Sequence, residues 1–210
     1  GEVALGFCFD RLLNDSSIEI TNYGAYLHQH PPQYPIQIVE ESSWSCVHGV
    51  ERWRNNCGCI IDPVKKGKQQ WRRALRDVLN RLRDITRTLF LEHTHAWLRD
   101  PMLLRHDWKY AVLTSTQKEA IQSHARVPLS EDQLMRIEYW MQQQELALKM
   151  FTSCGWFFDS NHGIETQQIL AYAKALIEHT HQYVDWPFEA SIQFELKALL
   201  SAREVELSNL

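Results

Sequence analysis

The spacing of apolar residues predicts a long amphipathic helix that begins near Gln69. Its apolar positions lie alternately four and three residues apart, as in a helix that packs along a neighbouring helix. These positions are Trp71, Leu75, Val78, Leu82, Ile85 and Leu89. Arginines between residues 72 and 87 occupy much of the remaining surface, with acidic residues among them. This mixture of charges favours a solvated face over a phosphate-binding one.

Residues typical of helix starts predict two further helices. Asp100 precedes Pro101, and proline suits the first turn of a helix, where its missing N–H would have no intrahelical partner. Ser130 can cap a second helix with its hydroxyl while Gln133 reaches back to it. The apolar stripe of this second helix comprises Leu134, Ile137, Met141, Leu148 and Phe151. We expect the helix to end at Cys154.

Two more amphipathic stretches lie near the end of the sequence. One runs from about Ile164 to Ile177, and residues 185–188 open the other, with Ile192, Leu196 and Leu199 facing inward. The sequence therefore predicts an all-α protein. Its architecture is an antiparallel bundle of five or more helices, with a long irregular Cys- and Trp-rich segment near the N-terminal third.

The N-terminal residues predict a separate helical part. Residues 1–13 are amphipathic and lack a preceding capping residue, which indicates a helix that continues from an upstream segment. Thr21 can cap a short helix that Pro31 and Pro32 terminate, and residues 34–39 alternate as in an extended segment. We therefore expect residues 1–30 to be a helical lead-in and residues 31–210 to be the bundle domain.

Composition narrows the class of protein. Of 210 residues, 44% are hydrophobic and 23% are charged, which is typical of a globular protein. With 22 Lys and Arg against 26 Asp and Glu, the chain lacks the positive charge of a nucleic-acid binder. It also has no apolar run long enough to cross a membrane, and residues 1–13 lack the basic start and the small-residue cleavage site of a signal peptide. We expect a cytoplasmic protein that binds neither nucleic acid nor membranes.

Two irregular segments, residues 42–59 and 152–165, carry the residues best suited to ligand recognition. Indole and phenyl rings can stack on the C–H faces of a sugar, while charged and imidazole groups bind its hydroxyls. The candidate substrate-binding residues are Trp44, His48, Arg52, Trp53, Trp156, Phe157 and Asp159. The alternative for each tryptophan is a place in the core, because tryptophan is buried on average.

The first irregular segment also contains a possible zinc site. Cys46, His48, Cys57 and Cys59 could supply four tetrahedral ligands. A single residue separates the members of each pair, however, whereas structural zinc knuckles usually have two or more. We therefore expect no cofactor and favour packed free thiols, with zinc as the alternative and a disulfide less favoured than either.

The sequence contains no signature of a nucleophilic triad, a phosphate loop or a dinucleotide site. Cys154 is a poor nucleophile if it ends a helix, because the carbonyl groups there oppose ionisation of a thiol. Acidic residues near the aromatic segments could in principle form the carboxylate pair of a glycosidase, but the sequence does not place any two at the required separation. We assign no catalytic residue.

The two irregular segments, SSWSCVHGVERWRNNCGC at residues 42–59 and TSCGWFFDSNHGIET at residues 152–166, resemble a known family. They are similar to the signature segments of a helical domain of unknown function, number 3536, that follows the catalytic domain in proteins related to glycoside hydrolase family 57. The resemblance extends over nearly the whole chain. It implies an α-glucan as substrate and an upstream catalytic barrel domain as partner, with the catalytic Glu and Asp lying in that barrel.

Two hypotheses follow. In the first, the chain is an accessory helical domain that completes the carbohydrate cleft of a glycoside hydrolase or glucanotransferase and is inactive alone. By the resemblance, Trp44, His48, Trp53, Trp156 and Asp159 are the residues that would reach the cleft. In the second, the chain is a metal-stabilised structural or protein-interaction module, in which the cluster of cysteines and His48, with Cys154 as a further candidate, holds the irregular segment together.

Overall fold

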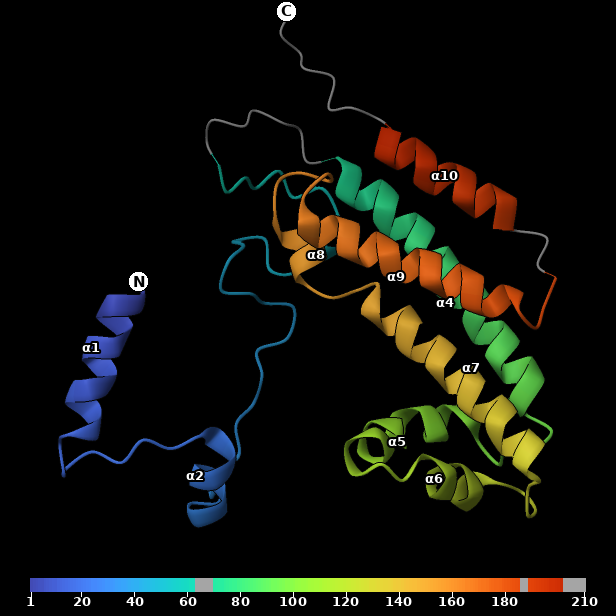
Figure 1. Ribbon diagram of the computed structural model, residues 1–210. Helices are drawn as coiled ribbons and strands as arrows, with labels where there is room; N and C mark the ends of the chain where they lie inside the picture. Colours follow the sequence, from blue (N-terminus) through green and yellow to red (C-terminus); the bar gives the residue numbers. More distant parts are fainter. Residues whose placement is uncertain (63–69, 186–188, 202–210) are drawn as a thin grey trace, which may run out of the picture. The chain divides into compact units, whose positions relative to one another are not determined.

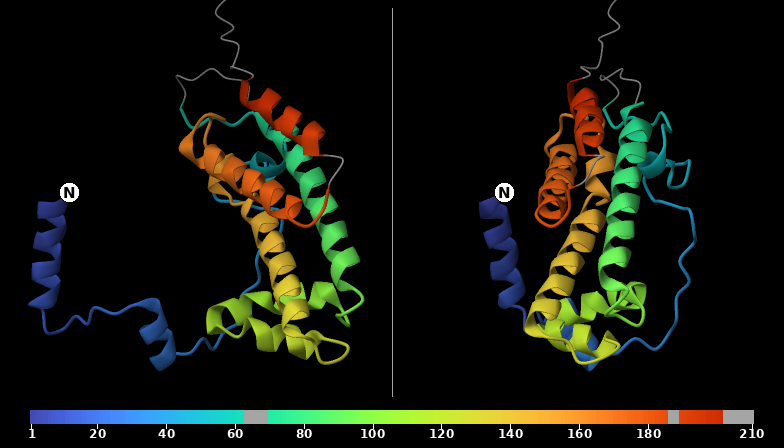
Figure 2. Two further views of the ribbon diagram at one scale, coloured as in Figure 1. Left: turned by 45° about the vertical axis from the view of Figure 1, so that its right-hand side comes forward. Right: turned by 90° about the vertical axis from the view of Figure 1, so that its right-hand side faces the viewer.

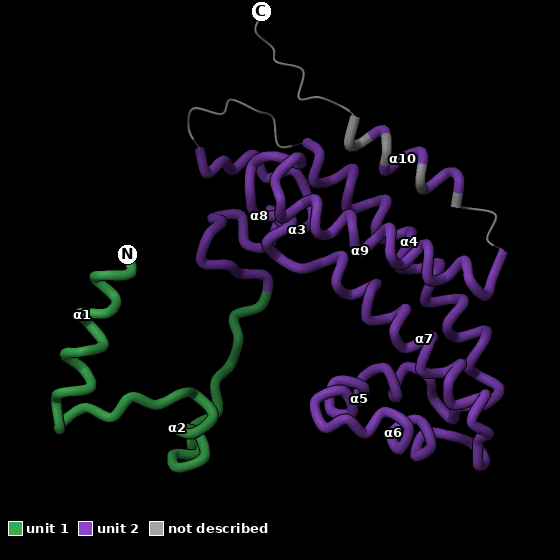
Figure 3. The backbone as a smooth tube through the Cα atoms, viewed as in Figure 1, with its two compact units in different colours: residues 1–40 green, residues 41–210 purple. Residues whose placement is uncertain are grey.

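A computed structural model describes residues 1–62, 70–185 and 189–201 (Figure 1). The chain falls into two compact units, residues 1–40 and 41–210 (Figure 3). The first unit contains α1 (Glu2–Leu13) and α2 (Tyr23–Gln29), and all of its residues are exposed. Asn22, rather than Thr21, caps α2: its side-chain oxygen accepts a hydrogen bond from the Ala25 N–H.

The second unit contains the remaining helices. They are α3 (Glu51–Arg54), α4 (Trp71–Thr94), α5 (Pro101–Thr114), α6 (Gln117–His124), α7 (Glu131–Lys149), α8 (Cys154–Phe157), α9 (Ile164–His181) and α10 (Glu189–Ser201). No strand occurs in the described parts of the chain, where a single antiparallel bridge joins Leu98 to Ala125. The prediction of an all-α protein is confirmed.

Helices α4, α7, α9 and α10 form the bundle of the second unit. Helix α7 runs antiparallel to its neighbours α4 and α9, and α10 packs along α4 (Figures 1 and 2). Helices α5 and α6 pack across one end of the bundle, whereas α3, α8 and the irregular segment lie at the other end. The prediction of an antiparallel helical bundle with a long irregular Cys- and Trp-rich segment is confirmed.

Two clusters of buried apolar side chains form the core. The first lies between α4, α7, α8, α9 and α10, and the second between the end of α4, the start of α7, α5 and α6. The first includes Leu75, Leu79, Leu82, Met150, Trp156, Ile169, Leu176 and Ile192, and the second includes Phe90, Leu98, Leu104, Trp108, Ile121, Ile137, Trp140 and Met141. The helical stripes predicted for α4 and α9 point into these clusters.

The predicted helix starts at α5 and α7 are correct. The Asp100 carboxylate accepts hydrogen bonds from the N–H groups of Met102 and Leu103, which have no carbonyl partner in the first turn. Ser130 and Gln133 form a complete capping box, with the serine hydroxyl accepting from Gln133 N and the glutamine oxygen accepting from Ser130 N.

Several expectations about the helices are wrong. Helix α7 ends at Lys149 rather than at Cys154, which instead begins the one-turn helix α8. Leu148 belongs to the predicted apolar stripe but is 56% exposed. Helices α3 and α6 were not anticipated, because each is short and has a weak apolar pattern. The predicted start of the last helix falls partly on residues 186–188, outside the described residues, as does the side chain of Leu199.

Within residues 1–62, 70–185 and 189–201, no helix combines the length and the hydrophobicity needed to cross a membrane.

Candidate metal centre

Cys46, His48, Cys57 and Cys59 converge at the bundle end that carries α3 and α8. Their ligand atoms, three Sγ and one imidazole nitrogen, all lie within 4.8 Å of one another. The Cys46 Sγ is 3.9 Å from the Cys59 Sγ and 3.8 Å from the His48 Nδ1, and the Cys59 Sγ is 3.3 Å from that nitrogen. All three cysteines are free thiols. The four residues thus form a Cys₃His cluster, a name we use below, with the ligand types that zinc prefers.

Glycine makes the short spacing in the Cys₃His cluster possible. Gly58, between Cys57 and Cys59, has a φ of +77°, a left-handed conformation that glycine adopts without the steric penalty of a side chain. The turn brings the Cys59 N–H to 3.4 Å from the Cys57 Sγ. Gly49 has a φ of +67°, and a Cβ there would lie 2.1 Å from the Glu41 carbonyl oxygen. Spacing alone was therefore a poor argument against a metal site.

The thiols of the cluster do not ionise independently. Burial opposes ionisation of Cys46, but hydrogen bonds from the backbone and ring of His48 and from the thiols of Cys59 and Cys57 outweigh burial and lower its pKa to about 7. Burial raises the pKa of Cys59, and the neighbouring Cys57 and Cys46 raise it further. Ionisation of one thiol therefore opposes ionisation of its neighbours, since like charges this close repel each other.

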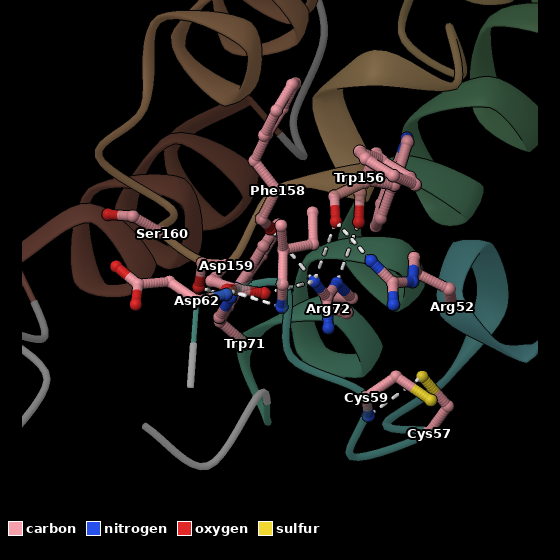
Figure 4. A network of polar contacts seen from close by, with 12 residues as sticks. Arg52, Cys57, Cys59, Asp62, Trp71, Arg72, Trp156, Phe158, Asp159 and Ser160 are labelled. Atoms are coloured by element: carbon pink, nitrogen blue, oxygen red, sulfur yellow. Dashed lines mark hydrogen bonds and ion pairs between the residues drawn. The ribbon is translucent and has the colours of Figure 1, made fainter. Parts of the chain in front are cut away.

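Two buried arginines lie beside the cluster and bind the end of α8. The side chain of Arg72 is fully buried, and its Nε donates to the Trp156 carbonyl at 2.8 Å. The Nη2 of Arg72 donates to the carbonyls of Phe157 and Phe158 at 3.3 and 2.9 Å. Arg52 donates from Nη1 to the Phe157 carbonyl at 2.9 Å. The two guanidinium groups satisfy carbonyls that the end of a helix leaves without partners. We call this arrangement the arginine junction; Figure 4 shows its side chains together with Cys57 and Cys59.

Asp159 connects the same junction to the irregular segment. Its Oδ2 accepts hydrogen bonds at 2.8 Å from the N–H groups of both Ile61 and Asp62. Its Oδ1 is buried without a hydrogen-bond partner and lies 3.9 Å from the Arg72 Nη2. Asp159 is itself buried, so the structure gives it the role of joining residues 61–62 to the turn after α8.

The charges within the junction are unbalanced. Arg52 and Arg72 are both buried and carry two positive charges, against one negative charge on Asp159. Burial lowers the pKa of Arg72, and repulsion from Arg52 lowers it further, whereas Cys57, Asp159 and Cys59 act in the opposite direction. Negative charge on the cluster thiols would therefore stabilise the buried guanidinium of Arg72.

The predicted aromatic residues occupy two different environments. Trp44 is 94% exposed, with its ring 6.2 Å from that of the partly buried Phe157. Trp53 stacks on the same Phe157 ring, with the two ring centres 6.4 Å apart. The Arg52 guanidinium lies 4.9 Å from the centre of the Phe157 ring. Trp156, by contrast, is fully buried and stacks on Trp71 in the core. Of the predicted substrate-binding residues, Trp44 and His48 are exposed and Trp53 and Phe157 are partly buried, so the accessible aromatic surface consists of Trp44, Trp53 and Phe157.

The structure thus brings together the two segments that the sequence singled out. The Trp53 indole N–H donates to the Ser153 carbonyl at 3.0 Å, and the Arg76 Nη1 donates to the Trp53 carbonyl at 2.7 Å. Cys154 is exposed and lies outside the Cys₃His cluster. The predicted solvated face of α4 is wrong for Arg72 and Arg76, which turn inward. The sequence carried no local signal for this, because the carbonyls that they bind lie more than twenty residues away.

Comparison with known proteins identifies the family of the chain. The family model described as "Domain of unknown function (DUF3536)" matches residues 68–205, more than half of the chain, and the chain therefore belongs to this family. The matched residues include helix α4, which carries Arg72 of the arginine junction, and the turn after α8. The Cys₃His cluster lies before the matched residues. No curated protein and no solved structure was found to match.

Proposed function

We propose that this member of the DUF3536 family is a zinc-stabilised accessory module, in which one Zn²⁺ held by the Cys₃His cluster fixes residues 46–62 against the helical bundle. The observation that carries the proposal is the convergence of four ligand atoms within 4.8 Å. In a tetrahedral site with Zn–S bonds of about 2.3 Å, two sulfur atoms lie ~3.8 Å apart. The distance of 3.9 Å between the Cys46 and Cys59 sulfurs agrees with this value.

The charges of the neighbouring residues support the same proposal. Three thiolates, a neutral histidine and Zn²⁺ together carry one negative charge. Arg52, Arg72 and Asp159 together carry one positive charge and are all buried. A zinc–thiolate centre would therefore neutralise the arginine junction, whereas three neutral thiols would leave a buried positive charge without compensation.

Zinc would act here as a structural ion. All four tetrahedral positions are filled by protein ligands, which leaves none for a substrate or a water molecule. The irregular segment lacks long helices and a core of its own, so the metal would supply the free energy that orders it. The ordered segment would in turn hold Arg52, Trp53 and the N–H groups of Ile61 and Asp62 against the α8 turn.

Metal analysis tests this proposal directly. The chain purified without chelators is expected to contain one zinc per molecule, and Cys57→Ser with Cys59→Ser is expected to remove it. The matched control is Cys154→Ser, because Cys154 is exposed and outside the cluster. Should the double variant be insoluble, Co²⁺ substitution of the unchanged chain gives a second readout, since thiolate coordination produces visible absorption bands. A folded chain that takes up neither metal would contradict the proposal.

A second candidate function concerns the surface formed by Trp44, Trp53 and Phe157. The almost complete exposure of Trp44, a large apolar side chain, favours a binding role for this surface. Together with the resemblance to domains that follow glycoside hydrolase family 57-related catalytic domains, this leads us to propose that the chain completes an α-glucan cleft beside an upstream catalytic barrel. In this proposal the chain supplies no catalytic residue, and the buried Trp156 and Asp159 support the surface from below.

Titration with a maltooligosaccharide tests the second candidate. We expect maltoheptaose to bind and Trp44→Ala to weaken binding about tenfold, since the exposed stacking face is lost. Tyr110→Ala is a suitable control, because Tyr110 is an exposed aromatic residue on α5. Equal affinities of the Trp44→Ala variant and the unchanged chain would exclude this surface as the sugar site.

A further inference from the structure

A cavity of about 690 Å³ lies between α5 and α7, beside Trp108 of the second core cluster and away from the Cys₃His cluster. Cavities of this size are typical of small-molecule sites. Most of its wall is hydrocarbon, from Met102, Trp108, Val112, Leu113 and Leu148. Leu113 and Leu148 are also largely exposed, so the wall continues to the surface of the molecule.

Positive charge lines the same cavity. Arg105 and Lys109 lie one turn apart on α5 and, with His106, contribute to the lining. The acidic group in the lining, Glu145, is already engaged: its Oε1 accepts from the Trp108 indole N–H at 2.7 Å, and its Oε2 lies 3.5 Å from the Lys149 Nζ. The charged rim of the cavity is therefore cationic.

Arg105 is the residue that most clearly requires a partner. Its Nε is buried and makes no hydrogen bond, and no ion pair joins it to any residue in the described part of the chain. Burial lowers the pKa of Arg105, and the positive charges of Arg87 and Arg83 lower it further. A partly buried guanidinium in this situation is destabilising unless an anion binds to it.

We propose that this cavity binds an amphiphilic anion, with an aliphatic chain along Met102, Val112 and Leu148 and an anionic head group on Arg105. A carboxylate suits the guanidinium because its two oxygens can accept parallel hydrogen bonds. The hydrocarbon wall that runs to the surface suits a linear aliphatic tail better than a compact polar metabolite. This site is independent of the zinc and glucan proposals.

Calorimetric titration of the full chain with dodecanoate, below its critical micelle concentration, tests the proposal. We expect saturable binding of one molecule per chain, about tenfold weaker binding of dodecanol, which lacks the charge, and no binding of dodecyltrimethylammonium. Saturable binding of dodecyl phosphate would show that the site takes anionic head groups in general. If dodecanol binds as tightly as dodecanoate, or dodecanoate does not bind, the proposal is wrong.

The Arg105→Met variant separates head-group recognition from folding. It keeps most of the hydrocarbon and removes an unpaired charge, so the variant is expected to be at least as stable to heat as the unchanged chain. It should nevertheless bind dodecanoate about tenfold more weakly or worse, while the affinity for dodecanol stays the same. Arg136→Met is the matched control, since Arg136 is exposed on α7 and paired with Asp132. An Arg105→Met variant with undiminished affinity for dodecanoate would refute a role for this guanidinium.

Discussion

At the end of the bundle formed by α5 and α6, helices that are neighbours in the sequence pack through apolar side chains, and hydrogen-bonding side chains cap the first turns of α5 and α7. At the end formed by α3 and α8, polar groups far apart in the sequence hold the chain together. Arg72 binds a carbonyl 84 residues away, and Asp159 binds an N–H group 98 residues away. The first end follows local rules of helix formation, whereas the second depends on buried charges that must all be paired at once.

The largest effect is expected at the arginine junction. Arg72→Met would leave the carbonyls of Trp156 and Phe158 without this donor, while that of Phe157 would keep only Arg52, and the change should lower the free energy of unfolding by about 3–5 kcal/mol. Denaturant unfolding followed by circular dichroism measures this change. Arg73→Met is the matched control, because the adjacent Arg73 is exposed and pairs with Asp77 on the helix surface. If both variants unfold at the same denaturant concentration, the junction does not stabilise this end of the bundle.

A smaller but still substantial effect is expected at Asp159. Asp159→Ala removes the acceptor for two backbone N–H groups and should destabilise the chain by about 2–3 kcal/mol. The substitution should accelerate hydrogen exchange at the N–H groups of Ile61 and Asp62 more than it accelerates exchange at residues of α5. Asp84→Ala, on the exposed face of α4, serves as the control. Uniform acceleration over the whole chain would indicate that the two ends do not differ as described.

At the other end of the bundle, single changes should have the size of ordinary helix caps. Ser130→Ala removes the capping box of α7 and should cost about 1 kcal/mol. Thr116 occupies the same position in α6 but makes no side-chain capping bond, so Thr116→Ala should cost less. Thermal unfolding of the two variants measures the difference. A larger loss from Thr116→Ala would contradict the role assigned to the capping box.

The smallest effect is expected at Leu148, although its position in the apolar stripe predicts a core residue. Because the side chain is largely exposed, Leu148→Gln should change the free energy of unfolding by no more than about 0.5 kcal/mol. Met141→Ala, on the buried part of the same helix, should cost about 2–5 kcal/mol. Comparable losses in both variants would place Leu148 in the core after all.

Much of the fold was predictable because its causes are local. The periodic stripe of α4 and the caps at Asp100 and Ser130 specify helices from a few neighbouring residues, and the antiparallel bundle follows from packing these stripes together. The short helices α3 and α8 were not predicted, because each has too few residues to show a periodic pattern. Their helical form depends on contacts with distant parts of the chain.

The candidate site was predictable in composition but not in detail. The Trp- and Cys-rich segments stood out as unusual, and they do lie side by side. The burial of Trp156, Asp159 and Arg72 could not be predicted, because it depends on which carbonyls and N–H groups the tertiary fold places opposite them. The spacing between the cysteines did not predict that their sulfur atoms would converge, since it does not report the left-handed conformation of Gly58.

X-ray absorption at the zinc K-edge of the purified chain tests the metal centre most directly. A Cys₃His site predicts three sulfur ligands at about 2.3 Å and one nitrogen ligand at about 2.0 Å. The Cys154→Ser variant should give the same spectrum. A coordination shell made of nitrogen and oxygen alone, or a folded chain that holds no zinc, would contradict the proposal that a metal ion orders this end of the molecule.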